Sequence, residues 1–503
     1  MILEIHGKLK PYYVQTLVMI FFPGVKFPEG EEPSPDTPMG TVTLDEDERE
    51  ARAAVTLRLG ERETSASAAV AWDSAHGDRD RIRKMAAGEA FMKAGEAMTG
   101  IRPPWGMLTG VRPAKVASEL IASGLTPEEA ADAIAREYSA APAKARLAVD
   151  VSLAESRVIT PESRRACSVY VGIPFCPTRC AYCSFVSYAS PGLLKLIPEY
   201  LDALMLDIDG VFETVKATGM RLASVYVGGG TPTVLNADQL RRLLAKIREH
   251  ADGYEEFTLE AGRPDTITKE KLAAAVEYGV TRVSVNTQTL NGEVLARIGR
   301  AHTPEMFREA YATARESGVR DVNVDLIAGL PYDTADSFRH TVDGVIALDP
   351  ENITVHTFSV KKSSDFKAEG RFDPASAVAA ESVDYSQAAL CTAGYLPYYM
   401  YRQKNTVGNL ENVGYAKPGH EGLYNIYMME EVHSIFAAGA SAVTKFVSVP
   451  KPDGSVRIER IFQPKYPYEY LRDYREDGGA GKRLALREAA AAFFADDPQK
   501  EEL

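Results

Sequence analysis

Three cysteines stand close together in the chain, Cys176, Cys180 and Cys183, with the spacing C-x3-C-x2-C. Thiolates this close along a chain can face one inorganic centre, and soft sulfur ligands select zinc, Cu(I) or iron–sulfur clusters. Structural zinc sites prefer paired cysteine knuckles that add up to four ligands. A second pair is missing here, because Cys167 and Cys391 stand apart and no histidine lies nearby. Three cysteines therefore favour a four-iron cluster with one iron left open.

The totals of the chain limit the classes of protein to which it can belong. At 503 residues it is too long for one ordinary domain, and three folded units are a reasonable expectation. Hydrophobic residues make up 45% and charged residues 25%, the composition of a soluble globular protein. The net charge of −13 argues against binding to nucleic acid or to an anionic membrane, since both select clustered lysine and arginine. The cysteine usage favours a reducing cytosol over a disulfide framework, so a cytoplasmic protein is expected.

Two regions precede the segment that carries the cysteines. Residues 1–77 alternate strand-like runs with turn-rich breaks, which predicts a small sheet-containing domain. Its apolar run from 14 to 22 is short and contains a glutamine, so we expect a buried strand there rather than a signal peptide or a membrane span. Residues 78–160 have a helical composition, and Thr126 with Pro127 has the form of a helix start. The strands predicted in the first region are 1–6, 12–22, 42–44, 53–59 and 65–72.

The middle of the chain repeats a pattern of strand, loop and helix. Apolar residues at helical spacing alternate with β-branched and aromatic runs, and Asn236 with Gln239 forms a capping-box pattern at one helix start. Strands alternating with helices indicate parallel βα units. We expect an α/β fold with an open, partial (β/α)6 TIM-like barrel over residues 161–362, an N-terminal α+β domain, and a mixed or helical domain over 363–503. The predicted barrel strands are 168–173, 224–228, 256–260, 282–286, 323–327 and 353–358.

Polar residues cluster where these strands end, the edge of a parallel barrel at which function is expected. The cysteines follow the first strand, and a Gly-Gly-Gly-Thr-Pro run at 228–232 follows the second, where glycines let the backbone approach a ligand closely. Acidic side chains suit an ammonium group or ribose hydroxyls, and a guanidinium suits a carboxylate, so this edge suits a zwitterionic ligand. The side chains concerned are Glu260, Gln288, Arg300 and Asp325.

The cysteine spacing, with the aromatic Tyr182 before the last cysteine, resembles the signature of the radical S-adenosylmethionine (SAM) enzymes. Further segments narrow the resemblance to the oxygen-independent coproporphyrinogen III oxidase family. The segment 398–405 and the long N-terminal extension look like the HemZ-type branch of that family, and the motifs together cover about residues 167–475. The other segments that carry the resemblance are 170–176, 226–233, 283–288, 323–331 and 415–421.

This resemblance implies two cofactors and the residues that hold them. The three cysteines would hold a [4Fe-4S] cluster, and the residues after the second strand would bind the methionyl amine of SAM. The acidic and amide side chains and the guanidinium at the other strand ends would bind the remaining polar groups of SAM. The residues assigned in this way to SAM or to the surroundings of the cluster are Tyr170, Tyr182, Gly229, Gly230, Thr231, Glu260, Gln288, Arg300 and Asp325.

The reaction that the resemblance implies is the oxidative decarboxylation of coproporphyrinogen III in anaerobic haem biosynthesis. One-electron cleavage of SAM would give methionine and a 5′-deoxyadenosyl radical, which would take a hydrogen atom from the β-carbon of a substrate propionate. Loss of CO2 and of one electron to an acceptor, carried out on two propionates, would give the vinyl groups of protoporphyrinogen IX. The implied partners are a small-molecule tetrapyrrole and a reducing electron donor such as flavodoxin or ferredoxin.

A tetracarboxylate substrate should need cations near the mouth of the barrel. Arg402 and Lys404 are candidates for this role, and Arg282 and His356 are weaker ones. For His356, which lies in the sixth predicted strand, a structural role inside the barrel is favoured over a catalytic one.

One position departs from the best-characterised members of the family. They carry a further cysteine two residues after the third, where this chain has Phe185, and the related haem-chaperone branch also lacks that cysteine. A haem-binding chaperone on the same scaffold is therefore one alternative to the enzyme. Another radical SAM reaction on a tetrapyrrole is a second, and a zinc-binding or structural role for the cysteines is a third. Cys167 is expected to be a small buried apolar residue, and Cys391, within a helical run, is expected to be equally inert.

Overall fold

The computed structural model describes residues 1–28, 37–72, 78–110, 112–183, 187–359, 377–403, 406–451 and 455–495. The chain divides into two compact units. Unit 1 consists of Met1–Leu153, Asp373–Ala380 and Met400–Glu411, and unit 2 consists of Ala154–Phe372, Glu381–Tyr399 and Asn412–Leu503. The domain boundaries expected after residues 77, 160 and 362 stay a prediction. Within the described ranges, no helix is long and apolar enough to cross a membrane.

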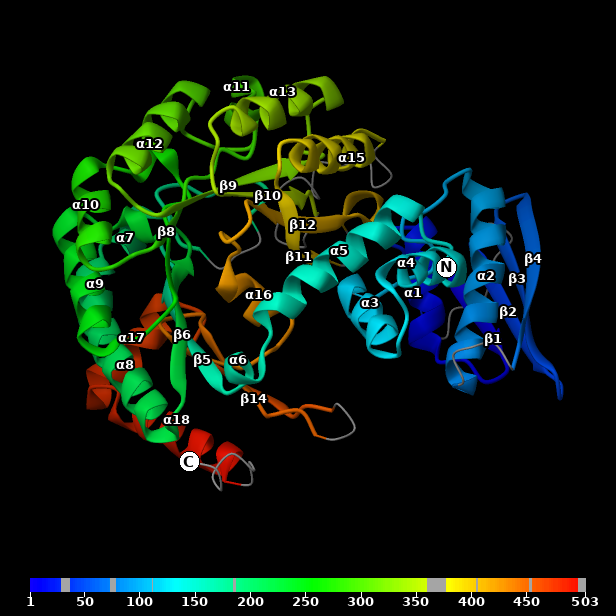
Figure 1. Cartoon of the computed structure of the whole chain (residues 1–503), viewed down its shortest axis with the longest axis horizontal. Coiled ribbons are helices and arrows are strands. Elements are labelled where there is room, and N and C mark those ends of the chain that lie inside the picture. Colours follow the sequence, from blue (N-terminus) through cyan, green and yellow to red (C-terminus); the bar gives the residue numbers. More distant parts are fainter. Residues whose placement is uncertain are drawn as a thin grey trace. The chain divides into compact units, whose positions relative to one another are not determined.

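Unit 1 contains a sheet formed, in this order, by β1 (Ile2–His6), β2 (Met39–Glu46), β3 (Glu50–Leu59) and β4 (Arg62–Ala71) (Figure 1). β1 is parallel to β2, and β2, β3 and β4 are antiparallel neighbours. Alternate residues of β3 are buried, namely Ala51, Ala53, Val55 and Leu57, as expected for a sheet with one face on the core. The strands predicted at 1–6, 42–44, 53–59 and 65–72 are confirmed.

The strand predicted over residues 12–22 is wrong, because Pro11–Phe21 forms a helix, α1. A proline fits the first helical turn, where a backbone N–H has no helical acceptor. The buried side chains of α1 are Val14, Leu17, Val18 and Phe21, which follow the helical spacing i, i+3, i+4 and i+7. This apolar stripe packs against small residues of α2 (Arg79–Thr99), where a Cβ added to Gly95 would lie 2.4 Å from the ring of Phe21. Tertiary packing of the stripe therefore outweighs the strand propensity of its residues.

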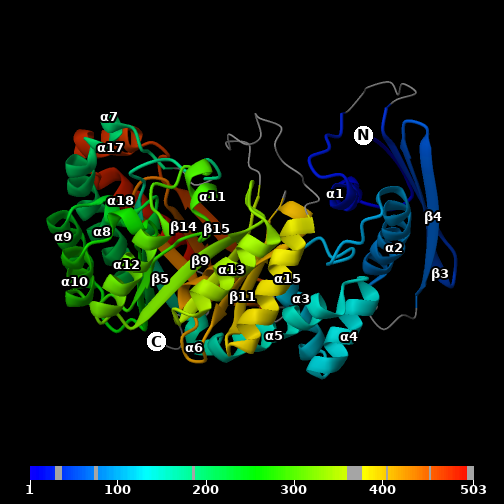
Figure 2. The same cartoon turned by 90° about the horizontal axis from the view of Figure 1, so that it is seen from above.

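The helices predicted over residues 78–160 are present as α2, α3 (Pro113–Ala122), α4 (Pro127–Glu137) and α5 (Pro142–Val158). Thr126 caps α4, as expected, in a reciprocal capping box with Glu129. The hydrophobic core of unit 1 joins the sheet to α1 and α2, and α2 runs along one face of the strands (Figure 2). Unit 1 is thus a two-layer α+β structure in its first hundred residues.

Parallel strands form the centre of the sheet in unit 2, namely β5 (Ala166–Ile173), β6 (Arg221–Gly229), β7 (Glu256–Glu260), β8 (Arg282–Ser284), β9 (Asp321–Ala328) and β10 (Asn352–Thr357). Each is parallel to the next in chain order. The six predicted barrel strands and the α/β fold are confirmed, and the strands curve with helices on their outer side (Figure 1). Because the strands are parallel, their carboxyl ends meet at one edge.

The C-terminal part of the chain extends this sheet on both sides. β13 (Ser434–Ala438) pairs in parallel with β5, and β14 (Val443–Val447) and β15 (Ile458–Phe462) follow it in antiparallel order. On the other side, β12 (Glu411–Ala416) is antiparallel to β10, and β11 (Leu396–Arg402) stands at the edge. Counted over the described residues, the sheet has eleven strands, of which only the end of β11 and the start of β12 belong to unit 1.

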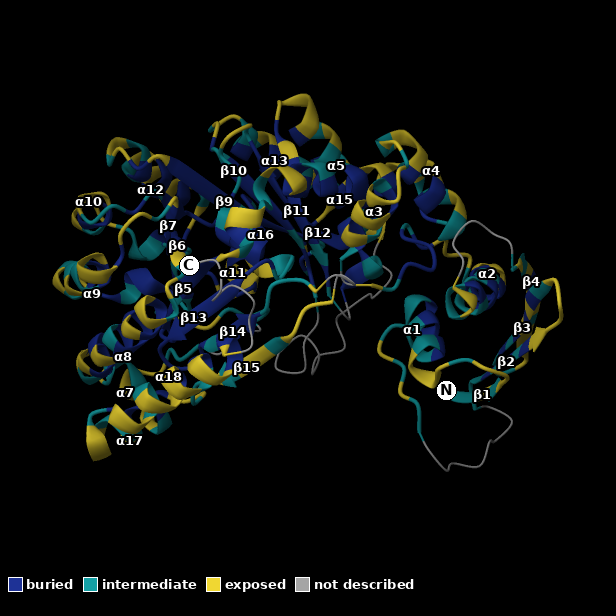
Figure 3. Cartoon of the chain, turned by 60° about the horizontal axis from the view of Figure 1, so that its bottom comes forward, coloured by how far each residue is buried: buried dark blue, intermediate teal, exposed yellow. Residues whose placement is uncertain are grey.

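The helices of unit 2 bury one side and expose the other (Figure 3). α9 (Ala237–His250) has the predicted capping box between Asn236 and Gln239, and Thr303 caps α12 (Pro304–Glu316) as expected. Buried residues of α9 are Leu240, Leu243, Leu244 and Ile247. Other helices of this unit include α6 (Pro161–Arg164), α7 (Pro191–Leu194), α8 (Ile197–Thr218), α10 (Lys269–Glu277), α11 (Gly292–Arg297), α13 (Ala335–Ile346), α16 (Leu423–Met429), α17 (Pro467–Asp477) and α18 (Ala480–Phe494). Helix α15 (Ala377–Thr392) also lies mostly in this unit, but its residues up to Ala380 belong to unit 1.

Side chains alternate between the two faces of the central strands. On β5, Val169 and Val171 are fully buried, while Tyr170 between them points to the other face, level with Tyr226 on β6. Carboxylates, amides and hydroxyls continue this second face along the other strands, where a packed barrel would carry valine, isoleucine and leucine. A polar inner face of this kind indicates a functional site.

Candidate functional site

The predicted cysteines lie in the loop that follows β5. Cys176 is 8% exposed, and Cys180 and Cys183 are partly exposed. The N–H of Cys176 donates to the carbonyl of Tyr188 at 3.1 Å, and the N–H of Tyr188 donates to the carbonyl of Pro174 at 2.8 Å. These bonds tie the two ends of the loop together. Residues 184–186, and with them Phe185, lie outside the described residues.

Two of the thiols have hydroxyl neighbours. The Sγ of Cys176 lies 3.3 Å from the Oγ1 of Thr231, and the Sγ of Cys183 lies 3.9 Å from the Oγ of Ser187. Burial raises the pKa of the Cys176 thiol; the two hydroxyls oppose this rise, while the nearby thiols of Cys183 and Cys180 add to it. The thiol of Cys176 therefore lies close enough to the other two to feel their charge, and a bound metal centre would favour its thiolate form.

Arg263 holds the middle of the cysteine loop. Its guanidinium donates to the Sγ of Cys180 at 3.6 Å and to the Oγ1 and the carbonyl oxygen of Thr178 at 2.9 and 3.4 Å. The carboxylate of Asp265 pairs with the same guanidinium, with Nε and Oδ1 3.0 Å apart. The sequence analysis missed Arg263, although its place three residues after Glu260, just past a strand end, is the signal that marks the other site residues.

The donor set of the loop fits a four-iron cluster. Thiolate sulfur is the usual ligand of such clusters, and three cysteines leave one iron for an external ligand. Within the described part of the chain, no three His, Cys, Asp or Glu side chains surround a single ion position. A cluster does not require this, because each of its cysteines binds a different iron.

The glycine turn after β6 packs directly on the cysteine loop. Gly229 has φ +109°, and a Cβ on Gly230 would lie 2.5 Å from the carbonyl oxygen of Phe175. The N–H groups of Gly230 and Thr231 donate to the carbonyls of Ile173 and Phe175 at 2.7 and 2.8 Å. Because these two N–H groups are used within the chain, carbonyl oxygens are the backbone groups that this turn offers to a ligand, and they accept from a donor such as an ammonium group.

Two carboxylates on the inner face differ in protonation. Burial raises the pKa of Glu260 to about 7, with a further rise from Asp325, although the hydroxyl of Tyr226 donates to its Oε1 at 2.5 Å. Burial acts in the same direction on Asp325, but hydrogen bonds and the charge of His356 hold its pKa below the usual value. The Nδ2 of Asn323 donates to the Oδ1 of Asp325 at 2.8 Å, and the Nε2 of His356 lies 3.8 Å from its Oδ2. Glu260 is therefore partly protonated at neutral pH, whereas Asp325 stays ionised.

Arg300 and Gln288 are buried beside the same edge and retain binding capacity. The Nε of Arg300 donates to the hydroxyl of Tyr182 at 3.1 Å and its Nη1 to the carbonyl of Gly262 at 3.0 Å. Among the residues described, Arg300 forms no salt bridge, and the Oε1 of Gln288 has no hydrogen-bond partner. Gln288 has φ +70°, and its N–H donates to the carbonyl of Asp325 at 3.0 Å. A buried charge and a buried acceptor of this kind are groups that a polar ligand can satisfy.

Three tyrosine rings form a wall on the inner face. The ring of Tyr226 lies 4.4 Å from that of Tyr424 on α16 and 6.1 Å from that of Tyr170, with interplanar angles of 24° and 16°. Burial raises the pKa of all three hydroxyls, so they remain protonated. The alternation of side chains along its strand could have predicted that Tyr226 lies on this face, but no sequence signal predicts that Tyr424 lies beside it. The wall offers stacking area to a flat ligand.

The residues assigned to the cluster and to SAM come together at one edge of the sheet in unit 2. Thr231 links the cysteine loop to the glycine turn, and Tyr182 links the same loop to Arg300. Tyr226 links Tyr170 to Glu260, because its ring stacks on Tyr170 and its hydroxyl donates to Glu260. Their roles remain proposals, but their proximity is a property of the fold.

Other sequence expectations have different outcomes. Arg282 is not at the mouth of the barrel, because it begins β8 at the opposite edge and pairs with Glu256 and Asp321 at 3.4 and 3.2 Å. Arg402 is a residue of unit 1, and Lys404 lies outside the described residues. Of the two remaining cysteines, Cys167 is fully buried as expected, whereas Cys391 is exposed on α15.

The chain is similar in sequence to several known proteins. The model of the radical SAM superfamily matches residues 170–345. The chain is 38% identical over 388 residues to the oxygen-independent coproporphyrinogen-III oxidase-like protein HemZ of Bacillus subtilis, covering 75% of each chain. It is 31% identical over 315 residues to the heme chaperone HemW of Bacillus subtilis, covering 60% of this chain and 77% of that one. It is 34% identical over 204 residues to the oxygen-independent coproporphyrinogen III oxidase of Pseudomonas aeruginosa, covering 39% of this chain and 44% of that one.

Proposed function

We propose that this chain, which belongs to the family of oxygen-independent coproporphyrinogen-III oxidase-like radical SAM proteins, is an oxidoreductase that acts on tetrapyrrole propionates. The cofactors of this family are a [4Fe-4S] cluster and SAM, which when bound supply a one-electron cleavage of the SAM sulfonium and a radical that takes hydrogen from carbon. The observation that carries the proposal is the junction of the cysteine loop with an edge of buried polar groups. A cluster and a zwitterion can meet there.

The cluster would be held by Cys176, Cys180 and Cys183. The guanidinium of Arg263, at 3.6 Å from the Sγ of Cys180, would reduce the negative charge on that sulfur and keep the loop closed. Tyr182, between the last two cysteines, would act indirectly, because its hydroxyl accepts from Arg300. The loop would thus fix the position of a guanidinium as well as that of the iron.

SAM would lie across the strand ends with its charged groups matched to the chain. Carbonyl oxygens at Gly229, Gly230 and Thr231 would accept from its ammonium, and Arg300 would pair with its carboxylate. The ribose hydroxyls would donate to carboxylates of the inner face, and the free Oε1 of Gln288 would accept a further N–H or O–H. The SAM-binding residues in this proposal are Tyr170, Tyr182, Gly229, Gly230, Thr231, Glu260, Gln288, Arg300 and Asp325.

The substrate would be a tetrapyrrole such as coproporphyrinogen III, packed near the wall of Tyr170, Tyr226 and Tyr424. Each reacting propionate would lose a hydrogen atom from its β-carbon, then CO2 and one electron to an acceptor, leaving a vinyl group. Two such reactions would give protoporphyrinogen IX. A small redox protein such as flavodoxin or ferredoxin would supply the reducing electron. The ionised Asp325, and Glu260 in its ionised fraction, would repel the substrate carboxylates, which keeps this part of the face for SAM.

The test is anaerobic reconstitution of the full chain with iron and sulfide, followed by incubation with SAM, dithionite and coproporphyrinogen III. We expect methionine, 5′-deoxyadenosine and protoporphyrinogen IX, separated by chromatography. Cys180→Ala should give none of them. Cys391→Ala is the matched control, because Cys391 is an exposed cysteine outside the site. If 5′-deoxyadenosine forms but protoporphyrinogen IX does not, coproporphyrinogen III is not the substrate, whereas the proposed cleavage of SAM still holds.

A haem-binding chaperone is a second candidate function. It is supported by Phe185, which stands where well-characterised oxidases carry a further cysteine, and by the 31% identity to a heme chaperone. Anaerobic titration with haem separates the two functions. Binding of one haem per chain, with no SAM cleavage under reductant, would favour the chaperone.

A further inference from the structure

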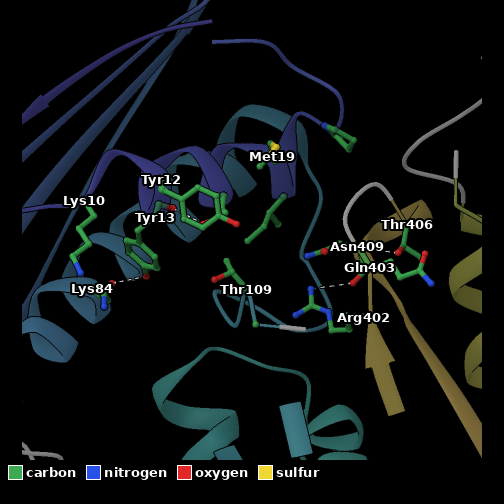
Figure 4. A pocket seen from close by; sticks show the side chains of 14 residues that line it. Lys10, Tyr12, Tyr13, Met19, Lys84, Thr109, Arg402, Gln403, Thr406 and Asn409 are labelled. Carbon is green, nitrogen blue, oxygen red and sulfur yellow. Dashed lines mark hydrogen bonds between the residues drawn. The ribbon is translucent and has the colours of Figure 1, made fainter. Parts of the chain in front are cut away.

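Unit 1 contains a cavity of about 400 Å³ that the proposed function does not use (Figure 4). Helix α1 lines one side with Tyr12 and Tyr13, and the segment that follows the edge strand β11 lines the other, with Arg402 at its base. The volume lies within the range of about 300–1,000 Å³ that small-molecule sites occupy. The cavity is therefore large enough for part of an organic ligand.

The charged residues that line the cavity are basic. Among the described residues that line it, Lys10, Lys84 and Arg402 are basic and none is acidic, although the chain has a net charge of −13. Asp80 partly offsets Lys84, with their Nζ and Oδ2 atoms 2.6 Å apart. Lys10 is exposed and lies at the α1 side of the cavity (Figure 4). An anion is thus the charged group that the cavity accommodates.

Arg402 is the buried cation of the cavity, with 4% of its surface exposed. Its Nη1 donates to the carbonyl of Leu108 and its Nη2 to the carbonyl of Asn409 at 3.2 Å, but its Nε has no acceptor among the described residues. The ring of Trp105 lies 5.6 Å from the guanidinium carbon. All of these partners are neutral, so no residue in the described part of the chain balances the positive charge of Arg402 by direct contact.

Glu411, the carboxylate whose charge acts on Arg402, already has a cationic partner. Glu411 accepts from the Nζ of Lys144 at 2.8 Å and from the Nε1 of Trp105 at 2.7 Å, so its charge is balanced by Lys144. Burial lowers the pKa of Arg402 to about 10 despite the charge of Glu411. Arg282 provides the contrast, because it is equally buried yet contacts two carboxylates, and its pKa is raised.

The side of the cavity that α1 lines is largely apolar or aromatic, whereas the opposite side carries the polar residues Thr109, Gln403, Thr406 and Asn409. The hydroxyl of Tyr13 donates to the carbonyl of Lys84 at 2.8 Å, which fixes its ring in the wall. Tyr12 is 60% exposed, and Met19 and Ile20 from the same helix complete this side. Large exposed aromatic rings beside a buried cation are typical of sites for ligands with an apolar body and an anionic group.

We propose that this cavity binds a carboxylate of an amphipathic, aromatic anion, with the carboxylate on Arg402 and the apolar body against Tyr12, Met19 and Ile20. Given the proposed function, on which this identification rests, the ligand is the propionate-bearing edge of a tetrapyrrole. The cavity is smaller than a whole tetrapyrrole with its side chains, so only an edge enters and the rest projects past Tyr12. The bound tetrapyrrole contacts unit 1 and gives the N-terminal extension a role in ligand capture.

Fluorescence anisotropy of coproporphyrin III, titrated with the full chain, tests this proposal. Lys10→Glu and Tyr12→Ala change exposed residues and should leave folding intact, yet each should weaken binding by about fivefold or more. Arg402→Gln should weaken binding by roughly tenfold or more through loss of a charge-assisted hydrogen bond. Lys115→Glu is the matched control, because it reverses one exposed charge of unit 1 outside the cavity and should leave binding unchanged.

Equal affinity of the Lys10→Glu, Tyr12→Ala and Lys115→Glu variants would overturn the proposal. Inorganic phosphate alone should not displace the porphyrin at a concentration at which the wild type and the Lys115→Glu variant stay equally folded. If it does, the proposal that the ligand needs an apolar body is overturned. Formation of 5′-deoxyadenosine by the wild-type chain, measured in parallel, separates this inference from the proposed function. If 5′-deoxyadenosine forms but the cavity variants bind the porphyrin as the wild type does, the cavity proposal is rejected. If binding depends on the cavity but no 5′-deoxyadenosine forms, the proposed enzyme is rejected.

Discussion

The Sγ of Cys176 and the Oγ1 of Thr231 lie 3.3 Å apart, although 55 residues separate them in the chain. The contact exists because β5 and β6 are parallel neighbours whose ends are in register, with Ile173 opposite Gly229. It joins the loop that would hold a cluster to the turn that would hold the SAM ammonium. The chemistry of the site therefore depends on how closely two backbone turns can approach.

Gly230→Ala tests that close approach. Its new Cβ would lie 2.5 Å from the carbonyl oxygen of Phe175 and 3.0 Å from the Sγ of Cys176, so the cysteine loop must move. We expect a loss of about 1–3 kcal/mol in stability and less iron bound per chain after reconstitution. Urea unfolding and iron analysis measure both. Gly192→Ala is the control, because a Cβ there meets nothing within 4 Å; equal iron content in the two variants would contradict the prediction.

Arg300→Gln tests the proposed carboxylate contact of SAM. Loss of a hydrogen bond to a charged group should raise the SAM dissociation constant by about 10- to 100-fold while the iron content stays at the wild-type level. Arg297→Gln serves as the control, since Arg297 is on the exposed side of α11 and pairs with Glu293 at 2.6 Å. Calorimetric titration of the reconstituted proteins with SAM gives the constants. Similar affinities for both variants would reject the assignment.

Glu260 predicts a pH dependence of stability. Because its pKa is raised to about 7 in the folded protein, the folded state binds the proton more tightly than the unfolded state does. That contribution to stability is present at low pH and is lost as the pH rises through about 7. Glu260→Gln should therefore raise the melting temperature of the SAM-free protein at pH 8 and change it little at pH 5. A shift of equal size at both pH values would show that ionisation is not involved.

Arg282→Met should destabilise unit 2 without altering the site. The substitution leaves the buried carboxylates of Glu256 and Asp321 without their guanidinium, which typically costs about 3–5 kcal/mol. The iron bound per folded chain should not change, because Arg282 begins β8 at the edge opposite the cysteines. Arg308→Met, which removes an exposed pair with Glu305, should cost less than about 1 kcal/mol. Urea unfolding of the two variants makes the comparison.

Local patterns along the chain were sufficient for much of unit 2. Each of the strands β5 to β10 is a short run of β-branched and aromatic residues, and the capping box of Asn236 and Gln239 marks its helix start. Helix α1 was not predicted, because the contacts that favour it are not local. Its residues have strand propensities, and the groove of small residues on α2 that makes a helix favourable lies some seventy positions further along the chain.

The residues proposed to carry the chemistry could all be recognised from local patterns in the chain: three cysteines at cluster spacing, a glycine turn, and acids and a guanidinium near strand ends. These are properties of neighbouring positions, and neighbouring positions are what a sequence displays. Three contacts could be known only from the folded chain: Arg263 contacts Cys180, Tyr424 stacks on Tyr226, and Arg402 lines a cavity of unit 1. Such contacts join segments far apart in the chain, and they follow from packing and strand register, which no local pattern encodes.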